Sequence, residues 1–374
     1  MTNLTAIGLA SDASLEGIRA AILSTDGEGF FEAGPDFFQP FSRDLKIFIN
    51  RAAKAAREGR EGAADIGKAG GEFTGACINA VEELLERNGI KRTHIDVIGV
   101  GGHEIHYQPR RSSEAMGRSL RIGDGKTIAE ESRIDVVSNL ADMDLAEGGA
   151  GRPIEALYLA ALARAHNAET PNAIVKIGDR TMIIYTPANA SLAELSAFDA
   201  GPAKQFLEEW ISLKAGAEGL SDEALRRGAV HTDVLRLMLL NPYLRRKPPK
   251  FFDARDFKLD PLLGLSLADG AATIVAFIAA CVRAALEIVS APPAEWIIVD
   301  GCRGAPPAIF TALEKALAGP VTRADAGGWR EDYLDAENAA FLAVRSLRKL
   351  PLTFPGATRV ARPMRGGVHW RAPR

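Results

Sequence analysis

The sequence predicts an α/β fold, built as two domains or as one large one. Short apolar runs of strand type alternate with longer helical stretches, an order that favours largely buried strands. Each half of the chain opens with an expected β-hairpin before this alternation, which indicates a coarse duplication. The 374 residues, 47% apolar and 25% charged, are enough to bury a sizeable core in either arrangement.

The first half is expected to begin with a hairpin whose tip could face a ligand. Residues 5–10 and 18–23 are its apolar strands, and the polar stretch 11–17 is its turn. An Ala-rich helical region from 43 to 87 follows, and its Gly70-Gly71 pair predicts a break or a close helix contact. Short strands at 95–100, 120–125 and 134–137 and a helical turn at 126–132 come next.

The second half follows residues 147–153, the richest glycine stretch of the chain. A glycine-rich loop before a helix suits anion binding, because its free N–H groups point at the ligand. It suits a plain domain junction at least as well, and both interpretations stay open. We expect strands at 173–177, 181–185 and 296–299, and helices at 154–166, 202–214, 221–239, 271–289, 307–317 and 335–347, followed by an irregular tail.

The charge and the sequence ends argue against several classes of protein. A net charge of −3 gives no electrostatic reason to expect a nucleic-acid or membrane partner. The basic run 244–250 is therefore expected to be a solvated loop. No secretion signal is expected at the N-terminus. Arg283 and Glu287 interrupt the apolar stretch 271–289, which favours a buried helix over a membrane span.

The cysteines and histidines indicate no metal site. Cys77, Cys281 and Cys302 are widely spaced and odd in number, so we expect neither a disulfide framework nor a metal motif, and a reducing cytoplasm is the expected setting. His103 and His106 lie three residues apart after a strand. An extended segment would place them on opposite faces, so we expect no metal there.

The segment 196–204 holds the strongest candidate for chemistry. Asp199 stands directly before Ala-Gly-Pro, after a stretch of strand and turn type. This order puts a carboxylate at the mouth of a sheet, on backbone that can approach a ligand closely. The alternative is an Asp that begins a turn or caps the following helix, which is common before Gly or Pro.

Seven segments along nearly the whole chain then suggest a family. They are G-L-A-S-D-A-S-L-E-G at 8–17, I-G-V-G-G-H-E at 98–104, R-I-G-D-G at 121–125, D-V-V with G-G-A-G at 135–151, F-D-A-G-P at 198–202, P-P-K at 248–250 and A-E-N-A-A-F-L at 336–342. In this order they resemble the motifs of the anhydro-N-acetylmuramic acid kinases, members of the sugar-kinase/Hsp70/actin superfamily. The resemblance implies two RNase H-like (actin-like ATPase) domains around a central cleft. The first would comprise residues 1–145 with 348–374, and the second 146–347.

The resemblance also implies a reaction and a set of roles. Members of the family cleave the internal anhydro bond of the sugar with water and phosphorylate the freed oxygen with ATP and Mg²⁺, in bacterial cell-wall recycling. Asp199 would be the general base, and a small-molecule amino sugar would be bound by Glu337, His103 and Asp144. The nucleotide would contact Ser11, Asp12, Ser14, Gly178, Gly201 and Gly301. The resemblance further implies a cytoplasmic protein and a homodimer.

The chain departs from these motifs mainly on the nucleotide side. Asp12-Ala13 replace a Gly-Thr pair, Asp179 replaces a glycine, and Cys302-Arg303 replace two glycines. The arginine-rich segment of the family is Ala141-Asp142-Met143 here. These changes leave an alternative open, in which the chain is a catalytically silent homologue that binds a sugar or a protein partner. Lys176, Lys204 and Arg303 are new cations that could compensate.

Overall fold

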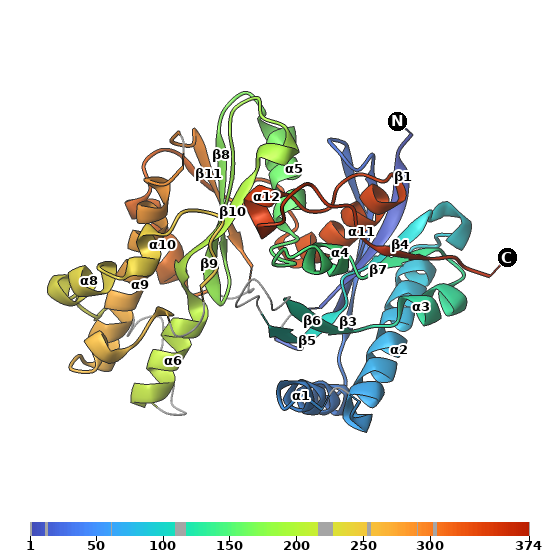
Figure 1. Cartoon of the computed structure of the whole chain (residues 1–374), viewed down its shortest axis with the longest axis horizontal. Coiled ribbons are helices and arrows are strands. Elements are labelled where there is room, and N and C mark those ends of the chain that lie inside the picture. The colour runs from blue at the N-terminus through green and yellow to red at the C-terminus, as the bar shows by residue number, and fades with distance from the viewer. Residues whose placement is uncertain are drawn as a thin grey trace. The chain divides into compact units, whose positions relative to one another are not determined.

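The computed structural model describes residues 2–11, 14–60, 62–108, 117–215, 227–252, 256–289, 291–301 and 305–373. They form two compact units (Figure 1). The first unit comprises Met1–Ala165 and Asp332–Arg374, and the second comprises His166–Glu331. Each unit is built on its own sheet and is described by itself below.

The first unit contains a six-stranded mixed sheet in the order β13-β7-β4-β1-β2-β3. Its strands are β1 (Leu4–Ala10), β2 (Gly17–Thr25), β3 (Phe31–Pro40), β4 (Val97–Val100), β7 (Val136–Ser138) and β13 (Val368–Trp370). The first three strands are antiparallel neighbours, whereas β1, β4 and β7 run parallel. Strands β5 (His103–Gln108) and β6 (Arg118–Ile122) form a separate antiparallel pair. The central strands are buried on both faces, as is typical of a sheet covered by helices.

Helices cover both faces of this sheet. They are α1 (Arg43–Arg57), α2 (Ala64–Arg87), the 3₁₀ turn η1 (Arg92–His94), α3 (Gly125–Ser132), α4 (Asp142–Ala146), α5 (Ala156–His166), α11 (Leu334–Leu347) and α12 (Pro355–Thr358). Ile7 and Leu9 of β1 pack in one core with α1, α2 and α3. Gly8 lies between them on the opposite face, because successive residues of a strand alternate, and it meets α11.

Helix α11 approaches the first sheet more closely than side chains would allow. A Cβ added to Gly8 would lie 1.7 Å from the carbonyl oxygen of Ala336, and one added to Gly99 would lie 2.0 Å from that of Ala339. Two glycines in adjacent strands and a row of alanines on the helix therefore bring the two backbones together. This contact fixes the height of α11, and with it Glu337, over the sheet.

The second unit contains a five-stranded mixed sheet in the order β10-β9-β8-β11-β12. Its strands are β8 (Asn172–Ile177), β9 (Arg180–Thr186), β10 (Ser196–Pro202), β11 (Glu295–Asp300) and β12 (Val321–Arg323). Its helices are α6 (Lys204–Ala215), α8 (Thr232–Leu239), α9 (Leu267–Leu286) and α10 (Pro307–Ala316), with 3₁₀ turns η2 (Leu192–Glu194), η3 (Pro242–Arg245), η5 (Asp260–Leu262) and η6 (Glu331–Tyr333), the last of which ends in the first unit. Part of the helix expected at 221–239 lies outside the described residues.

The two sheets repeat one topology. In each, three antiparallel strands come first, and the first of these pairs in parallel with the fourth, which pairs in parallel with the fifth. This is the RNase H-like arrangement of the actin-like superfamily, so the predicted fold class and the predicted duplication are confirmed. The second unit lacks a counterpart of β13 among its described residues.

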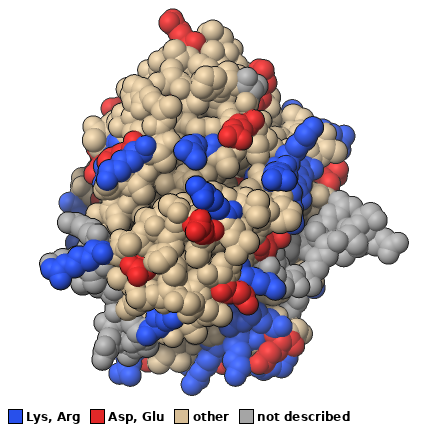
Figure 2. All heavy atoms as spheres, turned by 90° about the vertical axis from the view of Figure 1, so that its left-hand side faces the viewer, with Lys and Arg blue, Asp and Glu red and all other residues tan. Residues whose placement is uncertain are grey.

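Helix α9 is long and apolar enough to span a membrane, by length and composition alone. Most of it is buried in the core of the second unit, where Phe277, Ile278 and Cys281 pack among strands and helices. It therefore has the character of a core helix, as the sequence indicated. On the face of the molecule that carries α8, Lys and Arg side chains are interspersed with Asp and Glu (Figure 2).

Several expected elements differ from those observed. The break in the long helical region falls between α1 and α2, whereas Gly70 and Gly71 lie inside α2. The domain boundaries were expected after residues 145 and 347, but the contacts divide the chain at 165/166 and 331/332. The difference concerns α5 and α11. Both pack within the first unit, and an apolar periodicity shows that a helix is buried without showing which sheet it covers.

Candidate active site

The predicted base Asp199 lies near the end of β10, beside an irregularity in the pairing with β9. Asp199 is opposite Met182, but Gly201 is opposite Thr181, so Ala200 is an extra residue on its strand. A bulge of this kind bends a strand and re-aims a side chain, and bulges are frequent next to active sites. Asp199 is only 3% exposed, although the sequence had placed it at an open mouth of the sheet.

Two donors hold the carboxylate of Asp199. Arg180 approaches Oδ2 through Nη1 at 3.2 Å, and the backbone N–H of Phe252 donates to the same oxygen at 3.2 Å. A buried carboxylate needs such partners, because an uncompensated charge away from water is strongly destabilising. The alternative from the sequence was a turn or a cap on the following helix, but Asp199 lies inside β10 and α6 begins only at Lys204.

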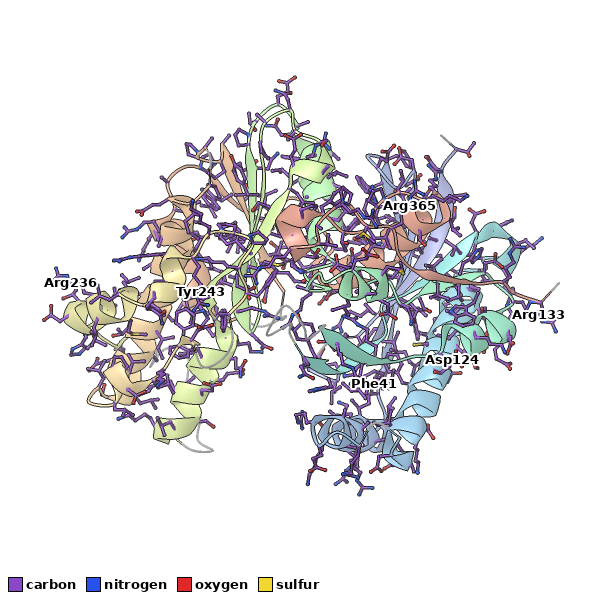
Figure 3. All side chains as sticks on the ribbon, viewed as in Figure 1. Phe41, Asp124, Arg133, Arg236, Tyr243 and Arg365 are labelled. Carbon is purple, nitrogen blue, oxygen red and sulfur yellow. The ribbon has the colours of Figure 1, made fainter. Side chains whose placement is uncertain are left out.

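The backbone of Asp199 is clamped as well. Its N–H donates to the carbonyl of Lys250 at 2.8 Å, and the hydroxyl of Tyr243 donates to its carbonyl at 2.9 Å. Tyr243 lies in the interior of the second unit (Figure 3), where burial and the charge of Asp199 raise the pKa of its phenol far above the ordinary value. Asp199 is therefore held in place at both its main chain and its side chain.

Lys250 is a buried member of this clamp, with 1% of its surface exposed. Its Nζ donates to the carbonyls of Leu244 and Tyr243 at 3.1 and 3.4 Å, and burial lowers its pKa to about 8. The sequence-based expectation of a solvated loop at 244–250 is therefore wrong for Lys250. The end of the segment 244–250 is directed into the protein, where the ammonium of Lys250 binds the carbonyls of Tyr243 and Leu244.

Three glycines predicted to bind nucleotide lie at one edge of the second sheet. Gly178 follows β8, Gly301 follows β11, and Gly201 precedes the last residue of β10. The pairs Asp300 with Ile177 and Pro202 with Arg180 bring these strand ends to the same edge. Ligands of open α/β sheets bind outside the carboxyl ends of parallel strands, and β8 and β11 end here.

This edge has the chemistry of a phosphate site. A Cβ added to Gly301 would meet the side chain of Lys176 at 2.6 Å, so that lysine lies against the turn. Arg180 and Lys204 begin the adjoining β9 and α6. Exposed Asp179 stands between Gly178 and Arg180. Glycine backbone beside several cations fits a nucleotide phosphate, and the carboxylate fits a cation bound to it.

Ser11 and His103, predicted to serve different ligands, contact each other in the first unit. Ser11 follows β1 and His103 begins β5, and their Oγ and Nδ1 atoms lie 3.0 Å apart. Burial and the nearby charge of Arg121 lower the pKa of His103 to about 4, so its ring is neutral at pH 7. Ser14 is exposed in the same turn, and Asp12 lies outside the described residues.

Glu337 lies in the first turn of α11 and is buried. The hydroxyl of Tyr158 on α5 donates to its Oε2 at 2.9 Å. Tyr158 is held in turn by ring contacts with Phe31 and Phe341. A carboxylate in the first turn of a helix is favoured by the helix dipole. The orientation of Glu337 is thus set by the protein itself.

The sequence of the chain matches a family of known kinases. A model of the anhydro-N-acetylmuramic acid kinase family matches residues 4–371. This chain belongs to that family. The anhydro-N-acetylmuramic acid kinase of Methylorubrum populi is 36% identical over 98% of this chain and 99% of its own length. That of Rhizorhabdus wittichii is 35% identical over 99% of this chain and its entire length.

A solved structure with some likeness is the ROK family glucokinase from Streptomyces griseus in complex with glucose and AMPPNP. It covers 91% of this chain and 99% of its own, with 13% identity and a TM-score of 0.40. A TM-score at this level supports no conclusion about chemistry. The family assignment therefore depends on the sequence match and on the repeated topology.

Asp144, predicted to bind the sugar, has its hydrogen bonds inside the protein. Its Oδ2 accepts from the hydroxyls of Thr353 and Thr358 at 2.5 and 2.6 Å, and its Oδ1 accepts from the N–H of Gly151 at 2.7 Å. A Cβ added to Gly149 would lie 2.0 Å from Oδ1. Asp144 therefore joins α4, the glycine-rich loop and the C-terminal segment, a geometry that favours a structural role in this member of the family.

No role could be assigned from the sequence to the side chains that surround Asp199 and Glu337. Arg180, Tyr243 and Lys250 surround Asp199, and Tyr158 binds Glu337. Two signals were available in the sequence: Arg180 directly follows the Gly178-Asp179 turn, and Lys250 ends the P-P-K segment. Among the described residues, no group of three or more His, Cys, Asp or Glu side chains is placed to hold a metal ion.

Proposed function

We propose that this chain is an anhydro-N-acetylmuramic acid kinase, which opens the internal anhydro bond of its sugar with water and phosphorylates the freed oxygen with ATP. The family match over residues 4–371, which includes Asp199 and Glu337, carries this proposal. The substrate is then a small-molecule amino sugar. We place the enzyme in the cytoplasm of a bacterium that recycles its cell wall, with no nucleic-acid or membrane partner, and we expect a homodimer by family resemblance.

Asp199 is the general base of the proposed reaction. Its carboxylate takes a proton from water, and the water oxygen bonds to the sugar carbon of the anhydro bridge. The bridging C–O bond breaks, and the freed oxygen attacks the γ-phosphorus of ATP, so that ADP leaves. A base is effective when it is held within hydrogen-bond distance of the proton it removes. The clamp on Asp199 by Phe252, Lys250 and Tyr243 provides such a fixed base.

Glu337 and His103 bind the sugar in this proposal. The carboxylate of Glu337 accepts hydrogen bonds from sugar hydroxyls, and Tyr158 keeps it oriented. His103 has a neutral ring at pH 7, because its pKa is lowered to about 4. A neutral imidazole can accept at one nitrogen and donate at the other. Since its Nδ1 lies against Ser11, its Nε2 is the nitrogen that would meet the sugar.

Backbone groups at Gly178, Gly201 and Gly301 bind the nucleotide in this proposal, together with the turn at Ser11, Asp12 and Ser14. Asp179 and Cys302-Arg303 stand where the family has glycines, and they weaken the backbone contacts with the phosphates. The positive charges of Lys176 and Lys204 compensate for this loss. Mg²⁺ would neutralise the phosphate charge, and exposed Asp179 is the carboxylate of this edge that would share it.

The experiment is turnover in H₂¹⁸O with Mg-ATP and anhydro-N-acetylmuramic acid. We expect ADP release only with sugar present, one ¹⁸O in the sugar and none in its phosphate. Asp199→Asn should lower the rate by about 10²- to 10⁴-fold, the usual contribution of a general base. The control is Asp233→Asn, an exposed aspartate on α8 paired with Arg236, which should leave the rate unchanged.

Other outcomes would contradict the proposal in distinct ways. Label in inorganic phosphate would indicate a plain ATPase. Sugar binding without any ADP release would leave the silent homologue as the explanation. An Asp199→Asn variant as active as the wild type would remove Asp199 from the chemistry.

A further inference from the structure

The pairing of β9 with β10 places Arg180 within reach of Asp199. Arg180 is the first residue of β9 and lies opposite Pro202, at the sheet edge that carries Gly178 and Gly301. The bulge at Ala200 shifts the register between them. Asp199 itself is opposite Met182, and Nη1 of Arg180 lies 3.2 Å from its Oδ2.

The two members of this pair are unequally exposed. The Asp199 side chain is 5% exposed, whereas that of Arg180 is 32% exposed. The carboxylate is thus almost fully shielded from water, whereas the side chain of its arginine partner is partly exposed. A positive charge at this distance favours the ionised carboxylate, which is the form that can accept a proton. Together with the N–H of Phe252 on the same oxygen, it also restricts rotation of the carboxylate.

We propose that Arg180 is a positioning residue for Asp199, which keeps the carboxylate of the base ionised and fixed in one orientation. This inference rests on the proposed function, because it presupposes that Asp199 is the base. Arg180 acts through Asp199 and takes no proton itself, since a guanidinium stays charged in proteins.

Several other charged and titratable groups that the structure describes lie near Asp199 or near its neighbours Tyr243 and Lys250. They are Tyr243 from η3, Arg246 and Lys250 from the segment that follows it, Asp256, and Cys281 from α9. Lys250 donates to the carbonyls of Tyr243 and Leu244, and Arg246 pairs with Asp256 at 3.1 Å. Tyr243 meets the backbone carbonyl of Asp199, whereas Arg180 and Phe252 meet its carboxylate.

The test is the pH profile of kcat/KM for Arg180→Gln and Arg180→Lys. Without the positive charge, Arg180→Gln should move the midpoint of the acid limb up by about one pH unit or more. It should also lower kcat at neutral pH by about 10- to 100-fold, because the base is misplaced. Arg180→Lys retains the charge and should keep the midpoint near that of the wild type.

The matched control is Arg236→Gln, which removes an exposed arginine on the outer side of α8 (Figure 3). It should change neither the midpoint of the acid limb nor kcat at neutral pH. If Arg180→Gln fails to fold, Arg180→Lys decides the matter at high pH. Deprotonation of the new lysine should then lower kcat/KM at a pH where the wild type and Arg236→Gln remain active.

Each outcome bears on one conclusion. A wild type without turnover would overturn the proposed function, and this inference would fall with it. A wild type with turnover and an Arg180→Gln variant with an unchanged acid limb would overturn this inference alone. This inference alone would also be overturned if kcat/KM of Arg180→Lys at high pH followed that of the wild type.

Discussion

The hydroxyl of Tyr158 donates to Oε2 of Glu337 at 2.9 Å, and this bond joins α5 to α11 inside the first unit. Both residues are buried, and rings of Phe31 and Phe341 pack against the tyrosine. The two residues are 179 positions apart in the chain. The protein itself thus orients the carboxylate of Glu337, through a tyrosine from a distant segment of the chain.

Tyr158→Phe should weaken sugar binding more than nucleotide binding. The change removes one donor from a buried carboxylate, a loss that costs about 1–3 kcal/mol. We therefore expect KM for the sugar to rise about tenfold, with KM for ATP nearly unchanged, in steady-state kinetics. Tyr107→Phe is the matched control, because it removes a tyrosine hydroxyl that binds the carbonyl of Ala150 in the same unit. Equal changes in both KM values would count against a sugar-binding Glu337.

Asp144→Asn should destabilise the first unit and leave the sugar KM unchanged. The carboxylate accepts from Gly151, Thr353 and Thr358, and an amide would turn its NH₂ group toward at least one of these donors. We expect a loss of about 2–4 kcal/mol in the free energy of unfolding, measured by denaturant titration. Asp142→Asn, an exposed change in the same helix, should cost little. A stable Asp144→Asn variant with a raised sugar KM would instead support the sugar-binding role expected from the sequence.

Strands that are buried on both faces could be predicted, and the partly exposed edge strand β3 could not. The runs that became β1, β4, β8 and β11 are continuous and apolar, which is the pattern of a covered sheet. Strand β3 was missed because Gly34, Pro35 and Asp36 interrupt it. Such residues are tolerated at the edge of a sheet, where β3 lies.

The candidate site could be predicted in part. Asp199 and Glu337 follow from short motifs that the sequence shows directly. The contact of Arg180 with Asp199 depends on the register of two strands and on one extra residue at Ala200, neither of which a linear pattern contains. The burial of Lys250 was missed for a similar reason, since its partners are backbone carbonyls and leave no mark in the sequence.

Gly8→Ala should lower the stability of the first unit. The added methyl would lie 1.7 Å from the carbonyl oxygen of Ala336, so α11 would have to move away from β1. Overpacking of this kind costs about 1–3 kcal/mol. Gly71→Ala is the control, because its Cβ would meet nothing within 4 Å and lies inside α2. It should raise stability by up to about 1 kcal/mol in the same denaturant titration. Equal effects of the two changes would show that α11 is not tightly packed on β1.

Lys250 should make the stability of the protein depend on pH in alkaline solution. Burial lowers the pKa of its ammonium from 10.5 to about 8 in the folded protein. Between these values the unfolded chain holds a proton that the folded chain lacks, so stability rises as the pH increases from about 8 to 10.5. Below pH 8 the lysine is charged in both states, and its contribution is constant. The full rise is on the order of 3 kcal/mol, the free energy of a shift of this size.

Lys250→Met removes the titrating group and should remove this rise. The measurement is Tm at intervals from pH 7 to 10.5 for the wild type and the variant. The difference between the two curves isolates the contribution of Lys250 from that of every other titratable group. Lys247→Met, an exposed lysine of the same segment, is the control and should follow the wild type. Parallel curves for the wild type and Lys250→Met would contradict this prediction. Since the carbonyl of Lys250 accepts from the N–H of Asp199, they would also mean that the backbone contact with Asp199 does not depend on a desolvated ammonium.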